Sequence, residues 1–409
     1  MQAVLKNAGG FRLGLLIIDA QTGKMLFARA PDEPYVPASN MKLLSLGAAV
    51  YRLGPDYWFS TSVTRPVGAL AHPDHLTLVG GGDPSLEQAT GEHSLAGLAR
   101  QVYAAGVRSV GHLRLDAHLI GAAAGTQEAG WSVPIVERPV SGLTLNDPAA
   151  GDGADLTTTP DTRAALLKLG GSWRAALERA GVRVEGTVQI QSAQLQSAQP
   201  GGRPEEGIAT TRSAPLSELA RAALKRSDNV WTEQLYARLG VNTQTPLWRP
   251  ASPLHARTHV LELLQKAGVT TDRLVIQDGS GLSGGNRLTP RALVGLLRYV
   301  YLRPLGTERS PNAAYVRGNN LLIEALPRAG TGTVSQQAAL LGGTLATRLS
   351  GLDVRAKTGT LSGVSALSGY LSTRSGRVVV FSILMDGYGG PGQDLRRVQD
   401  ALLRALAAD

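Results

Sequence analysis

Three short strings stand in a fixed order along the chain, and together they constrain its fold more than any other feature. They are Ser-Asn-Met-Lys at 39–42, Ser-Asp-Asn at 227–229 and Lys-Thr-Gly at 357–359, called here the first, second and third motifs. Of seven lysines, only Lys42 has a serine three positions upstream, and Lys357 opens the third motif. The set supplies a nucleophile, a base and a cationic site without a histidine, provided that the fold brings the three motifs together.

Composition excludes several kinds of site. The 409 residues, 43 % of them hydrophobic, are enough for two or three domains. The net charge of +9 comes from dispersed arginines, so no nucleic-acid-binding stripe is predicted. This positive charge is explained either by a general preference for arginine over lysine or by attraction to an anionic envelope polymer. The absence of cysteine excludes disulfides, thiol catalysis and cysteine-ligated metals.

The sequence implies no metal or organic cofactor. His255 and His259 stand four apart, but no glutamate follows His255 as a metalloprotease helix requires. We interpret both histidines as polar surface residues.

No membrane span or signal peptide is predicted. No stretch approaches the roughly 20 apolar residues that a transmembrane helix needs. The apolar run at 15–18 is too short for the core of a signal peptide, and Asp19, Gln21 and Thr22 follow it at once. The sequence alone leaves open a processed form and a cytosolic protein.

The two outer parts of the chain are expected to build one α/β domain with an antiparallel sheet. A buried helix is predicted with Ser39 in its first turn, and the third motif lies on a strand just before a hairpin. The predicted elements are a hairpin at 12–29, helices at 38–53, 216–226 and 230–239, a hairpin at 365–385 and an amphipathic helix at 394–408, which we expect to pack on the sheet.

The middle of the chain is predicted to be a separate inserted α/β domain. Ala-Gly-Val-Arg occurs at 105–108 and again at 180–183, each time after a helical stretch and before a strand, at 113–116 or 187–191. This indicates a repeated helix–strand unit. The expected organisation is 1–57 and 207–409 as one domain of α/β (α+β) class, interrupted by the insert at 58–206.

Ser39 and Lys42 are predicted to share one face of a helix because they stand three positions apart. A serine hydroxyl is a poor nucleophile until a base takes its proton. A lysine can do so only if its pKa falls far below about 10.4, through burial and a nearby cation, for which Lys357 is the candidate. The alternative is a helix-capping serine followed by an ordinary lysine.

The second motif offers a hydroxyl and an amide. Ser227 can relay a proton, and the side chain of Asn229 can bind a peptide carbonyl and Lys42. The alternative is a helix cap, which Ser, Asp and Asn all favour.

The third motif places a cation, a hydroxyl and strand amides on one edge. A peptide can add beside Gly359 and Thr360 as an extra strand, with its terminal carboxylate held by Lys357 and Thr358. The alternative is a turn at the end of a strand.

Residues 279–285 contain two misleading patterns. Gly-Leu-Ser-Gly-Gly at 281–285 matches a hydrolase nucleophile elbow, and 279–284 match Gly-x-Gly-x-x-Gly. Both patterns need a helix to begin at once, whereas the next helix is expected near Pro290. We interpret the segment as one tight loop, with a structural role or a place at the rim of a cleft.

The three motifs in this order resemble those of penicillin-binding proteins. With Gly-Gly-Gly-Asp-Pro-Ser-Leu at 80–86, Leu-Ser-Glu-Leu at 216–219 and Asp-Gly-Ser-Gly-Leu-Ser at 278–283, the chain resembles the class C low-molecular-mass penicillin-binding proteins, the D-alanyl-D-alanine carboxypeptidase/endopeptidase family, over nearly its whole length. The resemblance implies a transpeptidase- or β-lactamase-like domain, its central antiparallel sheet flanked by helices and interrupted by the insert.

The resemblance also implies a role for each motif residue. These roles are Ser39 as acylated nucleophile, Lys42 as proton acceptor, Ser227 as proton donor to the leaving D-alanine, Asn229 as ligand of the substrate amide, Lys357 and Thr358 as carboxylate ligands, and the amides of Ser39 and Thr360 as oxyanion hole.

The implied activity is that of a serine D,D-peptidase. It would hydrolyse D-Ala-D-Ala termini or D-alanyl cross-links of peptidoglycan stem peptides through an acyl-serine, with β-lactams as inhibitors, in a periplasmic or other extracytoplasmic location. Two features depart from the family pattern: the expected export signal is missing, and 149–160 are too few residues for the small domain that many members carry there.

Other functions remain open at this point. A β-lactamase on the same scaffold would need an efficient deacylating base, and no Glu-x-x-Leu-Asn stands between the second and third motifs. The remaining alternatives are an esterase using the same serine, a non-catalytic peptidoglycan-binding protein and, if the chain is not exported, a peptide-transport protein or cytosolic dipeptidase.

Overall fold

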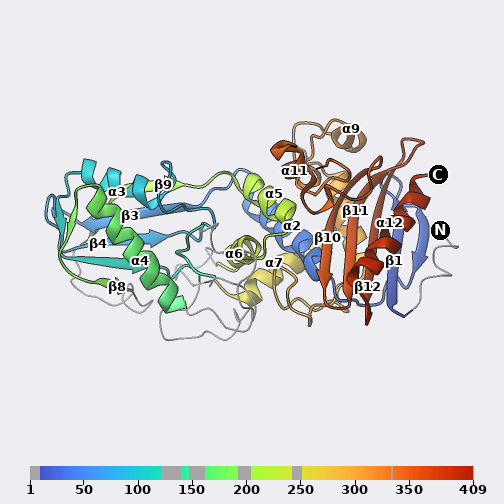
Figure 1. Cartoon of the computed structure of the whole chain (residues 1–409), viewed down its shortest axis with the longest axis horizontal. Coiled ribbons are helices and arrows are strands. Elements are labelled where there is room, and N and C mark those ends of the chain that lie inside the picture. Colours follow the sequence, from blue (N-terminus) through green and yellow to red (C-terminus); the bar gives the residue numbers. More distant parts are fainter. Residues whose placement is uncertain are drawn as a thin grey trace. The chain divides into compact units, whose positions relative to one another are not determined.

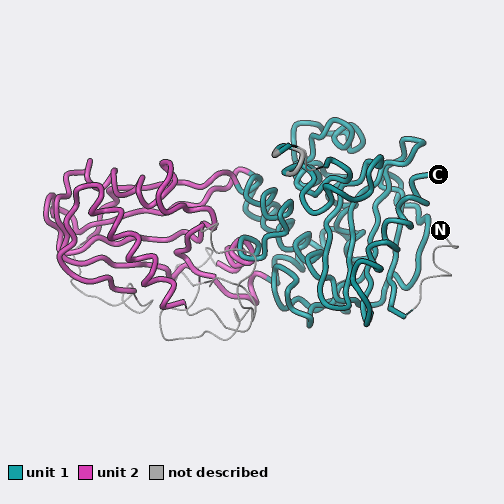
Figure 2. Tube along the Cα trace, in the orientation of Figure 1, with its two compact units in different colours: residues 1–55, 216–232, 257–409 teal, residues 56–215, 233–256 magenta. Residues whose placement is uncertain are grey.

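The structure, a computed structural model, describes residues 10–120, 140–146, 162–191, 204–241, 251–332 and 335–408. The chain divides into two compact units (Figure 2). The first unit comprises Met1–Pro55, Leu216–Thr232 and Arg257–Asp409, and the second comprises Asp56–Pro215 and Glu233–Ala256.

The first unit contains an antiparallel sheet of five strands in the order β10-β11-β12-β1-β2. Its strands are β1 (Arg12–Asp19), β2 (Met25–Arg29), β10 (Asp353–Leu361), β11 (Val364–Ser372) and β12 (Val378–Asp386). The first strand of the chain pairs along its whole length with the last, from Arg12 opposite Asp386 to Asp19 opposite Val379. The predicted antiparallel sheet and both predicted hairpins are confirmed.

Helices cover both faces of this sheet. Leu15, Ile17 and Phe381 pack in one apolar cluster with α12 (Gly392–Ala407), which lies along the sheet in Figure 1. Alternate residues of a strand point to opposite faces. Gly14 accordingly lies on the other face, where a Cβ atom would come within 2.8 Å of Pro290, the first residue of α8 (Pro290–Leu302). The expected packing of the C-terminal helix on the sheet is confirmed.

The helix after the first motif is buried, as its all-round apolar pattern predicts. The segment begins as a 3-10 turn, η1 (Ala38–Asn40), and continues as α2 (Met41–Leu53), whose residues 41–50 are all buried. Ala38 has φ +44°, a left-handed conformation outside the α-helical range. The expected single helix at 38–53 is therefore divided, and Ser39 lies in the 3-10 turn.

The part of the chain that the structure describes contains further helices after residue 215. They are α5 (Leu216–Arg226), α6 (Asn229–Leu239), α7 (Pro253–Lys266), α9 (Pro311–Val316), α10 (Leu321–Glu324), α11 (Gln336–Gly342) and the 3-10 turn η3 (Gly343–Leu345).

The second unit is built on a mixed five-stranded sheet in the order β8-β6-β4-β3-β9. Helices α3 and α4 contribute Leu98 and Trp173 to its apolar core. The elements are β3 (Ser60–Pro66), β4 (His75–Gly80), α3 (Leu95–Ala104), β5 (Ser109–Val110), β6 (His112–Asp116), α4 (Thr162–Arg179), β7 (Arg183–Val184), β8 (Val188–Ile190) and β9 (Glu205–Arg212).

The repeated helix–strand unit predicted in this region is present. Helix α3 leads into β5 and β6, and α4 leads into β7 and β8. The equivalent strands are neighbours, because β5 pairs with β7 and β6 pairs with β8, both in parallel. The two copies of Ala-Gly-Val-Arg thus begin adjacent, equivalent strands.

The two units differ in their bounds from the three predicted segments. The predicted boundary after residue 206 falls inside β9, which pairs with β3 from Ser60 opposite Arg212 and so belongs to the second unit. Residues 233–256 also return to that unit. Neither feature leaves a local mark in the sequence, since both depend on distant contacts. The segment 149–160 lies outside the described residues.

Among the described residues, no helix combines the length and the apolar character needed to cross a bilayer.

Among the described residues of the second unit, Trp173 is the largest fully buried side chain, and we expect Trp173→Ala to lower the free energy of unfolding by about 3–5 kcal/mol. Trp58, 42 % exposed and stacked under Arg212, is the matched control, for which we expect a loss of about 1 kcal/mol. Urea unfolding followed by circular dichroism measures both. Equal losses would contradict the assignment of Trp173 to the core.

Candidate active site

The first and second motifs meet at the amine of Lys42. Its Nζ atom donates hydrogen bonds to Ser39 Oγ at 3.0 Å and to Asn229 Oδ1 at 2.6 Å. A third bond, of 2.7 Å, goes to the backbone carbonyl of Ser280. The side chain of Lys42 is fully buried. The predicted nucleophile, the predicted base and the predicted amide ligand therefore form one connected group.

The second and third motifs meet at a second buried amine. Lys357 Nζ donates to Ser227 Oγ and to the carbonyl of Thr358, both at 2.9 Å. Burial lowers the pKa of Lys357 well below its ordinary value, and the nearby charge of Lys42 lowers it further. The sequence predicted that the charge of Lys357 lowers the pKa of Lys42; the structure shows the converse effect, in which the charge of Lys42 lowers the pKa of Lys357.

Ser227 occupies the C-terminal cap of α5. Its backbone N–H donates to Leu224 and that of Asp228 donates to Ala223, the pair of bonds that closes a Schellman motif. Ser227 has φ +59°, in the left-handed region where glycine is usual. A serine at this position carries a hydroxyl that glycine lacks, and the cap holds that hydroxyl beside Lys357.

The middle residue of the second motif, Asp228, is the helix cap that the sequence offered as an alternative for this motif. Asp228 Oδ1 accepts a hydrogen bond of 2.9 Å from the backbone N–H of Trp231 in the first turn of α6. Asp228 thus caps the helix, while its neighbours Ser227 and Asn229 contact the two lysines.

The glycine of the third motif allows β10 to lie against η1. A Cβ atom on Gly359 would stand 2.9 Å from the carbonyl oxygen of Pro37 and 3.0 Å from the amide nitrogen of Ser39. Asn40, fully buried, adds a hydrogen bond of 3.1 Å from its side-chain amide to the carbonyl of Lys357. Gly359 was predicted to bind substrate; in the structure it is buried against the turn that carries Ser39.

The other residues of this strand end reach the surface. Thr358 is half-buried, and Thr360 is exposed. The hydroxyl of Thr358 donates a hydrogen bond of 2.7 Å to the hydroxyl of Thr344 in η3. β10 is also an edge strand of the sheet, so this end offers both side chains and backbone for recognition.

The loop at 278–286 is the tight loop that we expected, and it supports the site. The buried carboxylate of Asp278 accepts hydrogen bonds from the backbone N–H groups of Gly281 and Ser283 and from the side chain of Asn286. Ser283, the serine of the elbow-like pattern, donates its hydroxyl to the side chain of Gln277. This serine therefore has a structural partner within its own loop.

Gly281 seats this loop against the first motif. Its φ is +86°, and a Cβ atom would stand 1.9 Å from the carbonyl oxygen of Ala38. Ser45 of α2 also donates a hydrogen bond of 2.6 Å to the carbonyl of Gly279. The loop is thereby fixed so that the carbonyl of Ser280 reaches Lys42.

The sequence of the whole chain matches one family model, that of the D-Ala-D-Ala carboxypeptidase 3 (S13) family, over residues 2–147 and 143–408. This chain belongs to that family. It is 30 % identical to a D-alanyl-D-alanine carboxypeptidase of Actinomadura sp. (strain R39), over 96 % of this chain and 81 % of that protein. Carboxypeptidase DacB of Mycolicibacterium smegmatis is similar to the same extent and over the same shares.

Solved structures share the fold of this chain. Penicillin-binding protein 4 of Haemophilus influenzae superposes with a TM-score of 0.74, at 20 % identity and over 99 % of each chain. A predatory peptidoglycan endopeptidase of Bdellovibrio bacteriovorus, Bd3459, does so with 0.58, at 16 % identity and over 96 % of this chain and 92 % of that one. The predicted family and fold class are confirmed, and the chain is an enzyme of the carboxypeptidase class.

A third buried lysine of this carboxypeptidase-family chain lies close to the motifs, and no sequence pattern marks it. Lys225, two residues before Ser227, donates to the carbonyls of Leu326 and Leu341. Its pKa is lowered to about 7, first by burial and then by the positive charge of Arg221. Lys225 thus joins the end of α5 to the segments before β10.

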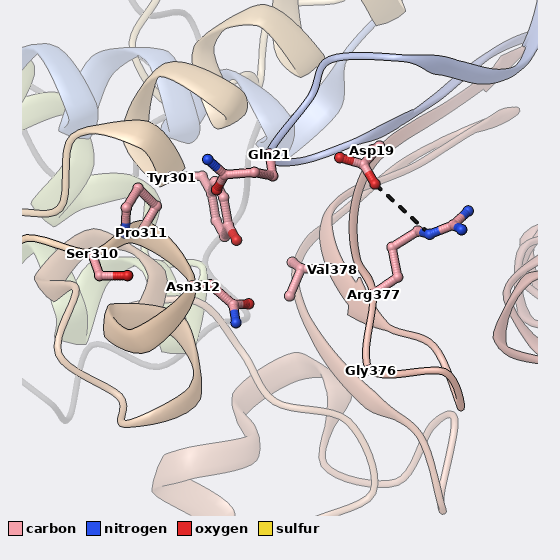
Figure 3. Close-up of a pocket in the computed structure, with 9 residues that line it drawn as sticks. All are labelled: Asp19, Gln21, Tyr301, Ser310, Pro311, Asn312, Gly376, Arg377 and Val378. Carbon is pink, nitrogen blue, oxygen red and sulfur yellow. Dashed lines mark ion pairs between the residues drawn. The ribbon is translucent and has the colours of Figure 1, made fainter.

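A separate hollow of about 420 Å³ lies in the same unit, lined by Asp19, Gln21, Tyr301, Ser310, Pro311, Asn312, Gly376, Arg377 and Val378 (Figure 3). It includes an ion pair of 3.8 Å between Asp19 and Arg377. None of its lining residues belongs to the three motifs, and Asp19 and Val378 lie at the end of the sheet away from Gly359. The hollow and the motif cluster are therefore different features of the first unit.

The described residues contain no group of three or more His, Cys, Asp or Glu side chains arranged to hold a metal ion. The ring of His259 pairs with Glu262 on its own helix at 3.0 Å.

We expect Gly359→Ala to lower the free energy of unfolding by about 1–3 kcal/mol, because the added methyl group meets backbone atoms of η1. Gly207→Ala, on strand β9, is the control: a Cβ atom there meets nothing within 4 Å, so the change should be neutral or slightly stabilising. Urea unfolding at pH 7 measures both. A tolerated Gly359→Ala would contradict the close approach of β10 to the Ser39 turn.

The lowered pKa of Lys225 predicts a pH dependence. Between about pH 7 and the ordinary lysine value near 10.5, the unfolded chain holds a proton that the folded chain lacks, so the free energy of unfolding rises with pH in this window. Lys225→Met should remove this part of the rise, whereas Lys266→Met, at an exposed position, should keep it. Urea unfolding at several pH values between 6.5 and 10 compares the slopes. Parallel slopes for wild type and Lys225→Met would refute the prediction.

Proposed function

We propose that this chain is a serine D,D-peptidase that hydrolyses D-Ala-D-Ala termini, D-alanyl cross-links, or both, in peptidoglycan stem peptides. The observation that carries the proposal is the 3.0 Å hydrogen bond between Lys42 Nζ and Ser39 Oγ in a site that also holds Lys357. A buried lysine beside a serine is an arrangement for nucleophilic catalysis without histidine. Membership of a carboxypeptidase family supports the same reaction.

Acylation begins at Ser39. Its oxygen attacks the carbonyl carbon of the D-Ala-D-Ala bond and its proton passes to the neutral amine of Lys42, while the backbone N–H groups of Ser39 and Thr360 stabilise the oxyanion. The intermediate then breaks its C–N bond, and the proton held by Lys42 passes through the hydroxyl of Ser227 to the leaving nitrogen of D-alanine. Water hydrolyses the resulting ester of Ser39, which releases the shortened peptide and restores the hydroxyl.

The two lysines have different tasks in this scheme. A substrate carboxylate beside Lys357 and Thr358 stabilises the protonated form of Lys357. Because charges of the same sign repel, a protonated Lys357 favours the neutral form of Lys42, which is the form that the proposed role as base requires. Carboxylate binding and activation of Ser39 are thus linked.

The remaining contacts orient the peptide. Asn229 accepts a hydrogen bond from Lys42 at Oδ1. Its side-chain NH₂ group is then free to donate to the carbonyl of the substrate. The exposed end of β10 at Thr360 receives the peptide as an additional strand. β-Lactams, which are cyclic amides with a carboxylate, are expected to acylate Ser39 as inhibitors. A substrate in the cell wall implies a periplasmic or other extracytoplasmic location.

Intact-mass measurement after incubation with benzylpenicillin tests the nucleophile. We expect an adduct of one drug molecule on the wild type and none on Ser39→Ala. Ser283→Ala is the matched control, because it removes the rival serine of the elbow-like pattern, and it should retain the adduct. An adduct on Ser39→Ala would overturn the assignment.

The same samples separate the other functions. Release of D-alanine from a peptide ending in D-Ala-D-Ala by the wild type, but not by Ser39→Ala, is the expected result. A wild type that consumes benzylpenicillin without a stable adduct would favour a β-lactamase. No adduct, no drug consumption and no peptide hydrolysis would favour a non-catalytic peptidoglycan-binding protein.

A further inference from the structure

Thr344 lies beside the site, although none of the three motifs contains it. It is exposed on η3, and its hydroxyl accepts the 2.7 Å hydrogen bond from Thr358. In the proposed function, the hydroxyl of Thr358 donates a hydrogen bond to the substrate carboxylate. The partner of that hydroxyl therefore bears directly on how the carboxylate is recognised.

The position of Thr344 is fixed by the helix that also positions Ser227. Gly343, the residue before it, has φ +50°, and a Cβ atom there would stand 2.3 Å from the carbonyl oxygen of Lys225. The amine of Lys225 donates a hydrogen bond of 2.7 Å to the carbonyl of Leu341. The backbone carbonyl and the side-chain amine of Lys225 thus both contact the segment at 341–343, which places η3 against the end of α5. Lys225 stands two residues before Ser227, whose backbone is left-handed.

The two hydroxyls have two protons between them, and their mutual hydrogen bond uses one. In the unliganded arrangement Thr358 donates and Thr344 accepts. A hydroxyl hydrogen rotates to suit its surroundings, so the direction of the bond can reverse. When Thr344 donates, the proton of Thr358 becomes available to an anion, and a donor that itself accepts a hydrogen bond is strengthened.

We propose that Thr344 is a positioning residue for carboxylate recognition, which donates to Thr358 when Thr358 donates to the terminal carboxylate of the substrate. The proposal rests on the proposed function and deepens it. It predicts preference for peptides with a free C-terminal carboxylate over the same peptides ending in a primary amide, because a hydrogen bond to a charged acceptor is stronger than one to a neutral acceptor.

Steady-state kinetics with an N-acylated tripeptide ending in D-Ala-D-Ala, and with its C-terminal amide, test the inference. For Thr344→Val we expect the KM of the carboxylate substrate to rise about 3- to 10-fold, the effect of one hydrogen bond. Its kcat should stay within about twofold, because the lost interaction is made equally in ground and transition states. The KM of the amide substrate should not change.

Two further variants separate this role from a general structural one. Thr344→Ser keeps the hydroxyl and should keep the wild-type KM. Thr307→Val removes another exposed threonine hydroxyl of the same unit, also in a 2.7 Å side-chain hydrogen bond, and should alter neither substrate. In Thr358→Val the additional change Thr344→Val should have no further effect on KM.

The outcomes distinguish the inference from the function on which it rests. If Thr344→Val leaves the carboxylate KM unchanged, or raises the KM of both substrates equally, the role of Thr344 is wrong while the peptidase activity stands. If the wild type hydrolyses neither substrate, the proposed function fails and the inference with it.

Discussion

The site is organised around two buried amines that need hydrogen-bond acceptors. Lys42 and Lys357 are both inaccessible to solvent, and an amine removed from water is costly unless polar atoms replace its hydration. The acceptors come from η1, from the start of α6, from the end of α5 and from the loop at 278–286. Satisfying the two lysines therefore requires segments from the whole first unit to converge.

The backbone around these amines adopts conformations that side chains usually avoid. Ala38 and Ser227 both have positive φ, and such positions cost of order 1–3 kcal/mol for residues other than glycine. Gly281 and Gly359 allow close packing instead. Each lacks the Cβ atom that would collide with the backbone of residues 37–39. Strain and close approach together set the position of the nucleophile relative to both lysines.

The three motifs, the sheet and the flanking helices could be predicted because each leaves a local pattern in the sequence. The contact of Lys42 with Ser280 could not, because a backbone carbonyl looks the same whichever residue carries it. Thr344 is a single threonine before a strand, without a distinctive spacing. The pairing of β9 with β3 joins residues about 140 to 150 positions apart, from Pro66 opposite Glu205 to Ser60 opposite Arg212, so no short window contains it. Asp228 shows that a capping signal and a functional signal can share one tripeptide.

The pairing of β1 with β12 has a consequence for the order of folding. Arg12 and Asp386 are 374 positions apart, yet they face each other in adjacent strands of the sheet. At about 5–20 residues per second, a ribosome needs roughly 20–75 s between the two. During that interval the apolar strand β1 lacks its neighbour on one side, and an unpaired strand edge invites association with other chains. The sheet of the first unit can close only after synthesis of its last hairpin, so this edge of β1 stays unpaired until the chain is nearly complete.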